Sequence, residues 1–190
     1  MVSGLVLLAL SAVSIPDTGE PGGGPPRLEV SEARRSGDHA AVSFRLANVL
    51  GAEALEQMRS GVPVVFRHRV EVLARRSAAP WPSKRHASMH IVTSAVFDSL
   101  TQRYELSRTI DLGNRHGLDS SPLEERSQTD SIERMRVWMT EFDQLPVLQL
   151  PETTRDSQLR VRVRSTLGRH YIFFLFPARI SVSAERGLEP

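Results

Sequence analysis

The chain has 190 residues, of which 40% are hydrophobic and 24% charged, and it contains no cysteine. This length fits one domain with a filled core, and the apolar content argues against disorder of the whole chain. Disulfides, thiolate metal sites and cysteine nucleophiles are excluded. The formal net charge is only +2 despite a sequence pI of about 9.6. Acidic residues are interleaved with the arginines, so we expect no nucleic-acid partner.

The N-terminal region predicts export. Residues 1–15 carry the apolar run Leu5 to Val13 and are read as a signal peptide or hydrophobic N-terminal segment. The alternatives are a wrongly assigned start codon and an ordinary apolar tail. The run is shorter than the roughly 20 residues of a membrane span, so no transmembrane anchor is expected after processing. Residues 16–26 form a Gly- and Pro-rich linker, and we expect the protein in the periplasm or cell envelope.

The first half of the folded region, which we place at residues 27–186, alternates between apolar and polar residues. Alternation on both sides of Ser36-Gly37-Asp38 predicts a β-hairpin. Residues 51–60 predict a short helix ended by Gly61. A long strand follows from Val62, with His68 on its core face, and two further strands cover residues 89–97 and 103–110.

The second half predicts a loop, a helix and a hairpin. Residues 113–129 are polar and indicate a long loop. Apolar residues spaced from Ile132 to Leu145 indicate an amphipathic helix capped by Asp130. Alternation from Leu159, with a turn at Gly168, predicts a C-terminal hairpin. The predicted fold is α+β, with a mostly antiparallel sheet of about seven strands in the order ββαβββαββ and two helices packed on one face.

Several of these segments resemble a known family. Gly61-Val62-Pro63, the run from Arg69 to Arg76, Thr101-Gln102-Arg103-Tyr104 and the closing strand Leu159 to Leu167 look like the bacterial exported-protein domain-of-unknown-function family 4390. The resemblance covers roughly residues 44 to 182. It implies export by a signal peptide, and it supplies no catalytic residues.

Residue patterns that would carry chemistry are few. The sequence has no Gly-x-Ser-x-Gly elbow, no His-Glu-x-x-His helix and no phosphate-binding glycine loop. His86 and His90 could pair, but no acidic residue between Pro80 and Val96 completes a metal shell. We expect His68 to be a hydrogen-bonded core histidine. The prediction is no cofactor, no metal and no catalytic residue, with an enzyme assembled from distant segments as a remaining alternative.

Arginines alternate with other residues along the predicted strand that follows Val62 and along the one that begins at Leu159. The arginines of each strand therefore lie on one face of that strand. If the two strands are neighbours, the arginines form a cationic surface able to hold a lipid headgroup, an acidic partner or an anionic polymer. The alternative is dispersal and pairing with Glu71, Glu105 and Asp111. The candidate anion- or partner-binding residues are Arg67, Arg69, Arg75, Arg160, Arg162 and Arg164.

Large apolar residues provide a second candidate site. A helix rich in methionine and aromatic residues, packed on a phenylalanine-rich strand, could enclose a small hydrophobic ligand, although such residues more often fill a core. We therefore expect a non-enzymatic envelope protein that binds a protein partner, with a lipid or other small hydrophobic or anionic ligand as the alternative. The candidate pocket residues are Met135, Trp138, Met139, Phe142, Phe174 and Phe176.

Overall fold

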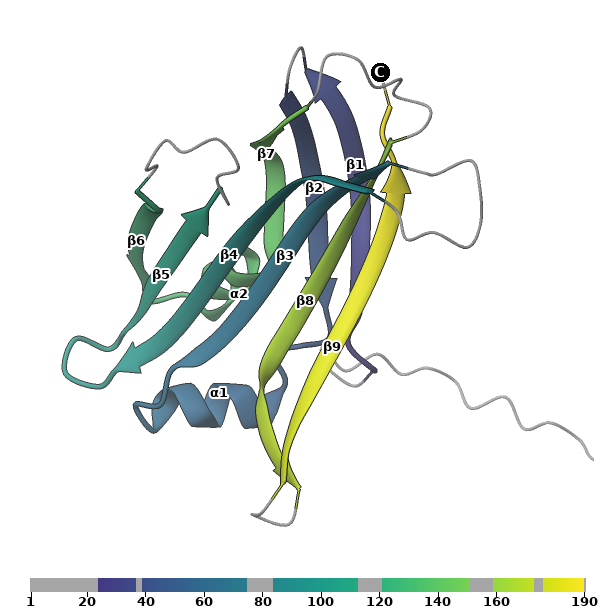
Figure 1. Cartoon of the computed structure of the whole chain (residues 1–190). Coiled ribbons are helices and arrows are strands. Elements are labelled where there is room, and N and C mark those ends of the chain that lie inside the picture. The colour runs from purple at the N-terminus through teal and green to yellow at the C-terminus, as the bar shows by residue number, and fades with distance from the viewer. Residues whose placement is uncertain are drawn as a thin grey trace, which may run out of the picture.

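The computed structural model describes residues 24–36, 39–74, 84–112, 121–150, 159–172 and 176–189. Within them lie nine strands and two helices (Figure 1). In chain order these are β1 (Arg27–Ser36), β2 (His39–Ala47), α1 (Ala52–Arg59), β3 (Val64–Ala74), β4 (Lys84–Asp98), β5 (Arg103–Asp111), β6 (Leu123–Thr129), α2 (Ile132–Thr140), β7 (Glu141–Gln149), β8 (Leu159–Ile172) and β9 (Phe176–Gly187).

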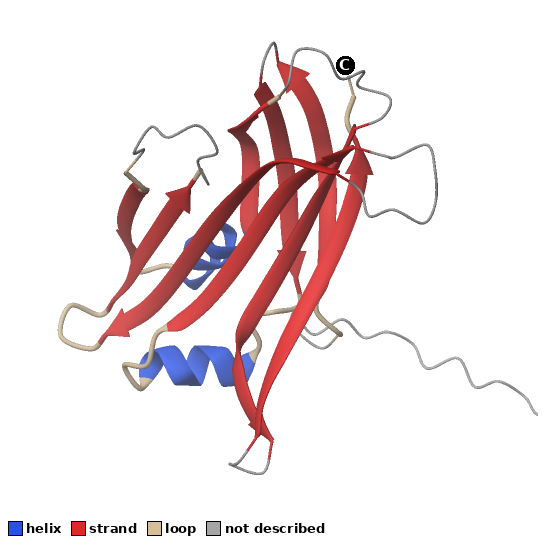
Figure 2. Cartoon of the chain, in the orientation of Figure 1, coloured by secondary structure: helices blue, strands red, loops and turns tan. Residues whose placement is uncertain are grey.

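The strands form two antiparallel sheets. The larger has the order β6-β5-β4-β3-β8-β9 and the smaller the order β1-β2-β7. Figure 2 shows the smaller sheet behind the long strands of the larger one. A parallel bridge between Arg34 and Glu189 connects β1 to the segment after β9, and two backbone hydrogen bonds of 2.8 Å hold it.

The core lies between the two sheets because each sheet turns its apolar face inward. Along β3 the even-numbered residues from Val64 to Val72 are buried, and the residues between them are more exposed or half-buried. Inward residues of both sheets meet in one cluster, which contains Val70, Ile91 and Phe44. The two helices contribute Met58, Met135 and Met139 to a second cluster, and all three are fully buried.

Helix ends follow local rules. α1 is followed by Gly61, whose φ of 80° lies in the left-handed region as the sequence predicted. The cap of α2 is Ser131 instead of the predicted Asp130, and its side chain accepts a hydrogen bond from the Arg134 amide at 3.3 Å. A serine one position nearer the helix satisfies the same free amide groups.

The α+β class with a mostly antiparallel sheet is confirmed, whereas the strand count, strand order and single sheet were wrong. Residues Leu123–Thr129 were assigned to a loop, but they form β6 on the edge of the larger sheet. The signal was missed because β6 is exposed up to Thr129 and therefore has no apolar alternation. The helix predicted to reach Leu145 ends at Thr140, and the chain continues as β7, which pairs with β2.

The C-terminal hairpin is confirmed, but Gly168 is not its turn. β8 continues through Gly168 to Ile172, and the β8–β9 register shifts between Thr166 and Arg169. Gly168 therefore lies at an irregularity inside a strand. Glycine is common at such irregularities as well as in turns. The predicted signal segment at 1–15, most of the predicted linker and residues 113–120 lie outside the described residues.

Candidate binding surface

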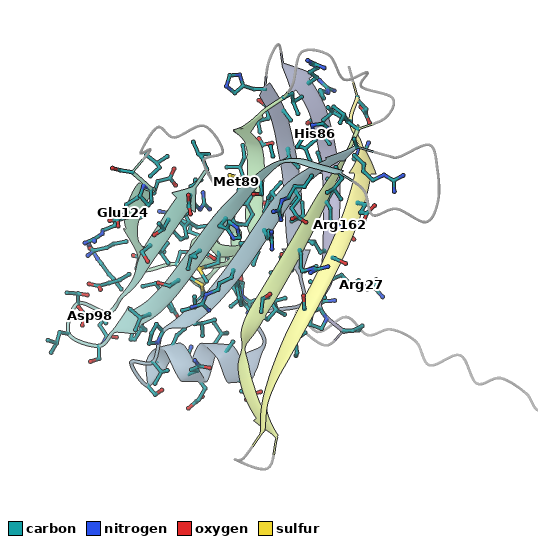
Figure 3. All side chains as sticks on the ribbon, in the orientation of Figure 1. Arg27, His86, Met89, Asp98, Glu124 and Arg162 are labelled. Atoms are coloured by element: carbon teal, nitrogen blue, oxygen red, sulfur yellow. The ribbon has the colours of Figure 1, made fainter. Side chains whose placement is uncertain are left out.

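The arginine-bearing strands β3 and β8 are neighbours in the larger sheet. Their antiparallel register places Arg69 directly opposite Arg164 and Glu71 opposite Arg162. Directly opposed residues share a face, and here it is the face turned away from the core, because the residues between them are buried. Figure 3 labels Arg162 on β8. We define the arginine face as Arg67, Arg69, Arg85, Arg160, Arg162 and Arg164.

Two glutamates neutralise part of the arginine face. Glu71 Oε1 lies 3.1 Å from Arg69 Nε and 3.1 Å from Arg85 Nη1. Glu185, on β9, lies 3.2 Å from Arg160 and 2.5 Å from Arg162. Burial by itself raises the pKa of Glu185, but the hydrogen bonds from Arg162 and Arg160 outweigh it and lower that pKa overall.

Arg67 and Arg164 have no hydrogen-bond or ion-pair partner among the described residues, and both are exposed. Arg164 also faces the like charge of Arg69 across the strand pair. Like charges directly opposite one another destabilise a sheet. The end of the arginine face at Arg67 and Arg164 therefore carries positive charge without an ion-pair partner among the described residues.

The sequence left open whether the two arginine rows are neighbours, and the β3–β8 register places them side by side. Arg75 lies outside the described residues. Of the acids named as possible partners, Glu71 does pair with arginines of this face. Glu105 instead lies on β5, opposite Val96 of β4. The sequence reading missed Glu185, although its alternation with Ser181 and Ser183 on β9 was a usable signal.

A groove begins where the arginine face ends. It has a volume of about 810 Å³ and is open to solvent. α1 and the ends of β3, β8 and β9 form its walls, and Arg67 and Thr166 belong both to this groove and to the outer face. Its lining includes Asn48, Ala54, Gln57, Val65, Phe66, Arg67, Leu167, Gly168 and Ile180.

Of the predicted apolar pocket residues that the structure describes, Met135, Met139 and Phe142 are buried in the core and Trp138 is partly buried against it. Met135 and Met139 are fully buried, and Phe142 stacks on Phe44 with ring centroids 4.4 Å apart. The Arg108 guanidinium lies 4.5 Å from the Trp138 ring centroid and donates a hydrogen bond to the Trp138 carbonyl oxygen. Phe174 and the side chain of Phe176 lie outside the described residues.

His68 and Ser165 form a polar pair inside the core. His68 Nδ1 and Ser165 Oγ are 2.8 Å apart, and the two residues are only 1% and 0% exposed. His68 Nε2 is buried without a hydrogen-bond partner among the described residues. Burial, with a smaller effect from the Arg108 charge, lowers the pKa of His68 to about 3. The imidazole is therefore neutral. His68 is buried and hydrogen-bonded, as the sequence predicted for a structural histidine.

The described residues provide neither a metal site nor a membrane-spanning helix. They contain no group of three or more His, Asp or Glu side chains placed to hold a metal ion. None of the helices described is long and apolar enough to cross a membrane.

Comparison with family models gave one match, to a domain of unknown function named DUF4390, over residues 26–171. The chain belongs to the DUF4390 family. The DUF4390 match begins just before β1 and ends near the end of β8, and it includes every residue of the arginine face. Glu185 and the rest of β9 lie beyond it. Neither the curated proteins nor the solved structures gave a match.

Proposed function

We propose that this DUF4390 protein is an exported, non-enzymatic envelope protein that binds an acidic protein partner through its arginine face. The observation that carries the proposal is the register that sets Arg69 against Arg164, together with the lack of an ion-pair partner for Arg67 and Arg164 among the described residues. Such an arrangement weakens the isolated fold. A partner carboxylate placed between the guanidinium groups removes that repulsion.

The chemistry of arginine favours carboxylates as the bound groups. A guanidinium presents paired donors that match the two oxygens of a carboxylate. Clustered charges of one sign also steer an oppositely charged protein toward the surface and raise its association rate, in a way that salt suppresses. Glu71 and Glu185 hold the flanking arginines in place, which lowers the entropy lost when a partner binds.

The test is site-specific crosslinking in the host cell. A photoreactive amino acid replaces Thr166, which pairs with Arg67 on the outer face of the sheet. We expect a crosslinked product with a second protein, and we expect Arg67→Gln/Arg164→Gln to reduce its yield about tenfold or more, as loss of two charge-assisted contacts implies.

The matched control is Arg103→Gln/Arg134→Gln, which removes the same amount of charge from two exposed arginines on β5 and α2. A crosslinking yield that is unchanged in the Arg67/Arg164 variant contradicts a specific role for the arginine face. So does a yield that falls equally in this variant and in the Arg103/Arg134 control.

Export rests on the apolar run Leu5 to Val13 and the Gly- and Pro-rich segment after it. Fractionation of cells that carry the untagged chain, followed by determination of its N-terminal residue, tests this part separately. Full-length chain in the cytoplasmic fraction contradicts export without affecting the binding proposal.

A further inference from the structure

The arginine face continues onto β4 through His90. In the two antiparallel registers, Arg69 on β3 lies opposite Arg164 of β8 on one side and opposite His90 of β4 on the other. Residues that oppose one another share a face of the sheet, and His90 points away from the core because its chain neighbours Met89 and Ile91 are both buried. Arg164, Arg69 and His90 therefore form a line across three adjacent strands, which Figure 1 shows side by side.

The side chain of His90 is available for binding. It is exposed and has no hydrogen bond or ion pair among the described residues. It differs in this from His68, which is buried, and from His39 and His86, which already have interactions. An incoming group can therefore contact the His90 imidazole without first displacing a partner that the structure describes.

The charges that face His90 are of both signs. On β3, Arg69 lies directly opposite, and Arg67 and Glu71 lie diagonally to either side. On β5, Asp111 lies directly opposite. Glu71 is already paired with two arginines, and Asp111 also has an interaction. The uncharged residues that share this face beside His90 on β4 and β5 are Ser88, Val92 and Thr109.

The surface stays positive when the carboxylates around it are counted. By strand register, the carboxylates nearest to the line of Arg164, Arg69 and His90 are Glu71, Asp111 and Glu185. Even with Glu53 of the neighbouring groove included, four carboxylates stand against the six arginines of the arginine face. Asp111 lies beyond His90 on the β5 side, so it bounds the positive surface there. An incoming carboxylate therefore meets positive charge along the line and not on β5.

Histidine adds a response to pH that arginine lacks. Arginine stays charged throughout the range in which proteins are folded, whereas an exposed histidine changes its charge between about pH 5 and 8. The charged imidazole donates two N–H groups and the neutral one donates a single N–H group. A carboxylate placed beside an imidazole favours the charged form. Coupling between two binding events is reciprocal, so charging the imidazole also tightens the binding of the carboxylate.

We propose that His90 is a binding residue of the arginine face, and that it takes up a proton when an acidic partner binds. The affinity for the partner then rises as the pH falls. The inference rests on the proposed function, and it adds both a residue and a form of regulation to that same surface.

The probe is a capped octa-aspartate peptide, and the protein is the full chain without a histidine tag. Calorimetric titration at pH 6.5, in two buffers that differ in ionisation enthalpy, gives the number of protons taken up with each bound peptide. We expect an uptake of up to roughly 0.4 proton, and an affinity that rises about two- to fivefold from pH 7.5 to pH 5.5, as one exposed ion pair implies. His68 stays neutral throughout, because its pKa in the folded chain is about 3.

Three variants separate His90 from other effects of pH. His90→Gln should lose the proton uptake and the rise in affinity. His90→Arg carries a permanent charge, so it should bind at pH 7.5 as tightly as wild type binds at pH 5.5, with no further rise. His39→Gln removes an exposed histidine from the smaller sheet and should behave as wild type.

Equal proton uptake in wild type and His90→Gln overturns the inference, as does an affinity of His90→Arg that still rises in acid. If the same peptide loses affinity for Arg67→Gln/Arg164→Gln, the arginine face stands and only the role of His90 is rejected. A peptide that binds this double variant as tightly as wild type, or that binds neither protein, rejects the arginine face as an acid-binding surface and His90 with it.

Discussion

Acid is expected to destabilise the folded chain through His68. The imidazole is 1% exposed, packs against Phe44 and Phe142 with ring centroids 5.5 and 4.8 Å away, and bonds to Ser165. Its pKa is about 3 in the folded chain against 6.5 in the unfolded chain. Between these values the unfolded chain binds a proton at this residue and the folded chain does not, so stability falls as pH decreases.

The size of the effect follows from the two pKa values. One pKa unit corresponds to about 1.4 kcal/mol. Between pH 7 and pH 5, His68 alone should remove about 2 kcal/mol from the free energy of unfolding, and about 3 kcal/mol by pH 4. These losses are large beside the roughly 5–15 kcal/mol stability of a typical domain.

The measurement is urea unfolding, followed by circular dichroism, at pH 7 and pH 5 on wild type and His68→Gln. Carboxylates titrate in both proteins, so the difference between their pH dependences isolates the histidine. The stabilising contribution of Glu185, in particular, should be lost in acid in both proteins, because the pKa of Glu185 is lowered in the folded chain.

If His68→Gln does not fold, the double substitution His68→Phe/Ser165→Ala serves in its place. It removes both hydrogen-bonding partners together, so neither is left unpaired, and phenylalanine can pack against Phe44 and Phe142. Equal pH dependence in wild type and a folded variant would mean that His68 is not neutral and buried as described. A wild type that gains stability on acidification relative to the variant would reverse the sign and refute the reasoning.

Three further predictions concern stability, each checked by urea unfolding at neutral pH. Arg164→Gln should stabilise the chain by up to about 1 kcal/mol because it removes the repulsion with Arg69. Arg162→Gln, two residues away, should instead destabilise the chain slightly because it breaks the contact with Glu185. Equal effects of the two substitutions would contradict the observed β3–β8 register. Ser43→Ala should cost about 0.5–1.5 kcal/mol, since the buried Ser43 Oγ donates to Asp143 at 2.9 Å and accepts from the Gln144 amide at 2.9 Å, and both partners are exposed enough to bond to water instead. Gln144→Gly should stabilise by up to about 1 kcal/mol because Gln144 has a φ of 41°, and a loss of stability would show that its side chain matters more than its backbone.

The periodicity of apolar residues predicted those helices and strands that have one face on the core and the other face on solvent. The alternation along β3, including the inward His68, was readable because strand side chains repeat every two residues. β6 escaped prediction because it is an exposed edge strand, and β7 because the apolar spacing of Met139, Phe142 and Leu145 fits a helix as well. In that segment pairing with β2, about a hundred residues earlier in the chain, overrides the local preference.

The sequence by itself determined the α+β class, the arginine alternation on each strand and the burial of His68, because these depend on residue spacing within single segments. Only the tertiary structure decided that β3 and β8 are neighbours, that Arg69 faces Arg164, and that Glu185 pairs with Arg160 and Arg162. The groove also belongs to the tertiary structure, since it exists only where two strands part. Strand pairing between distant segments is set by how all the apolar faces fill one core together, and no local pattern records that outcome.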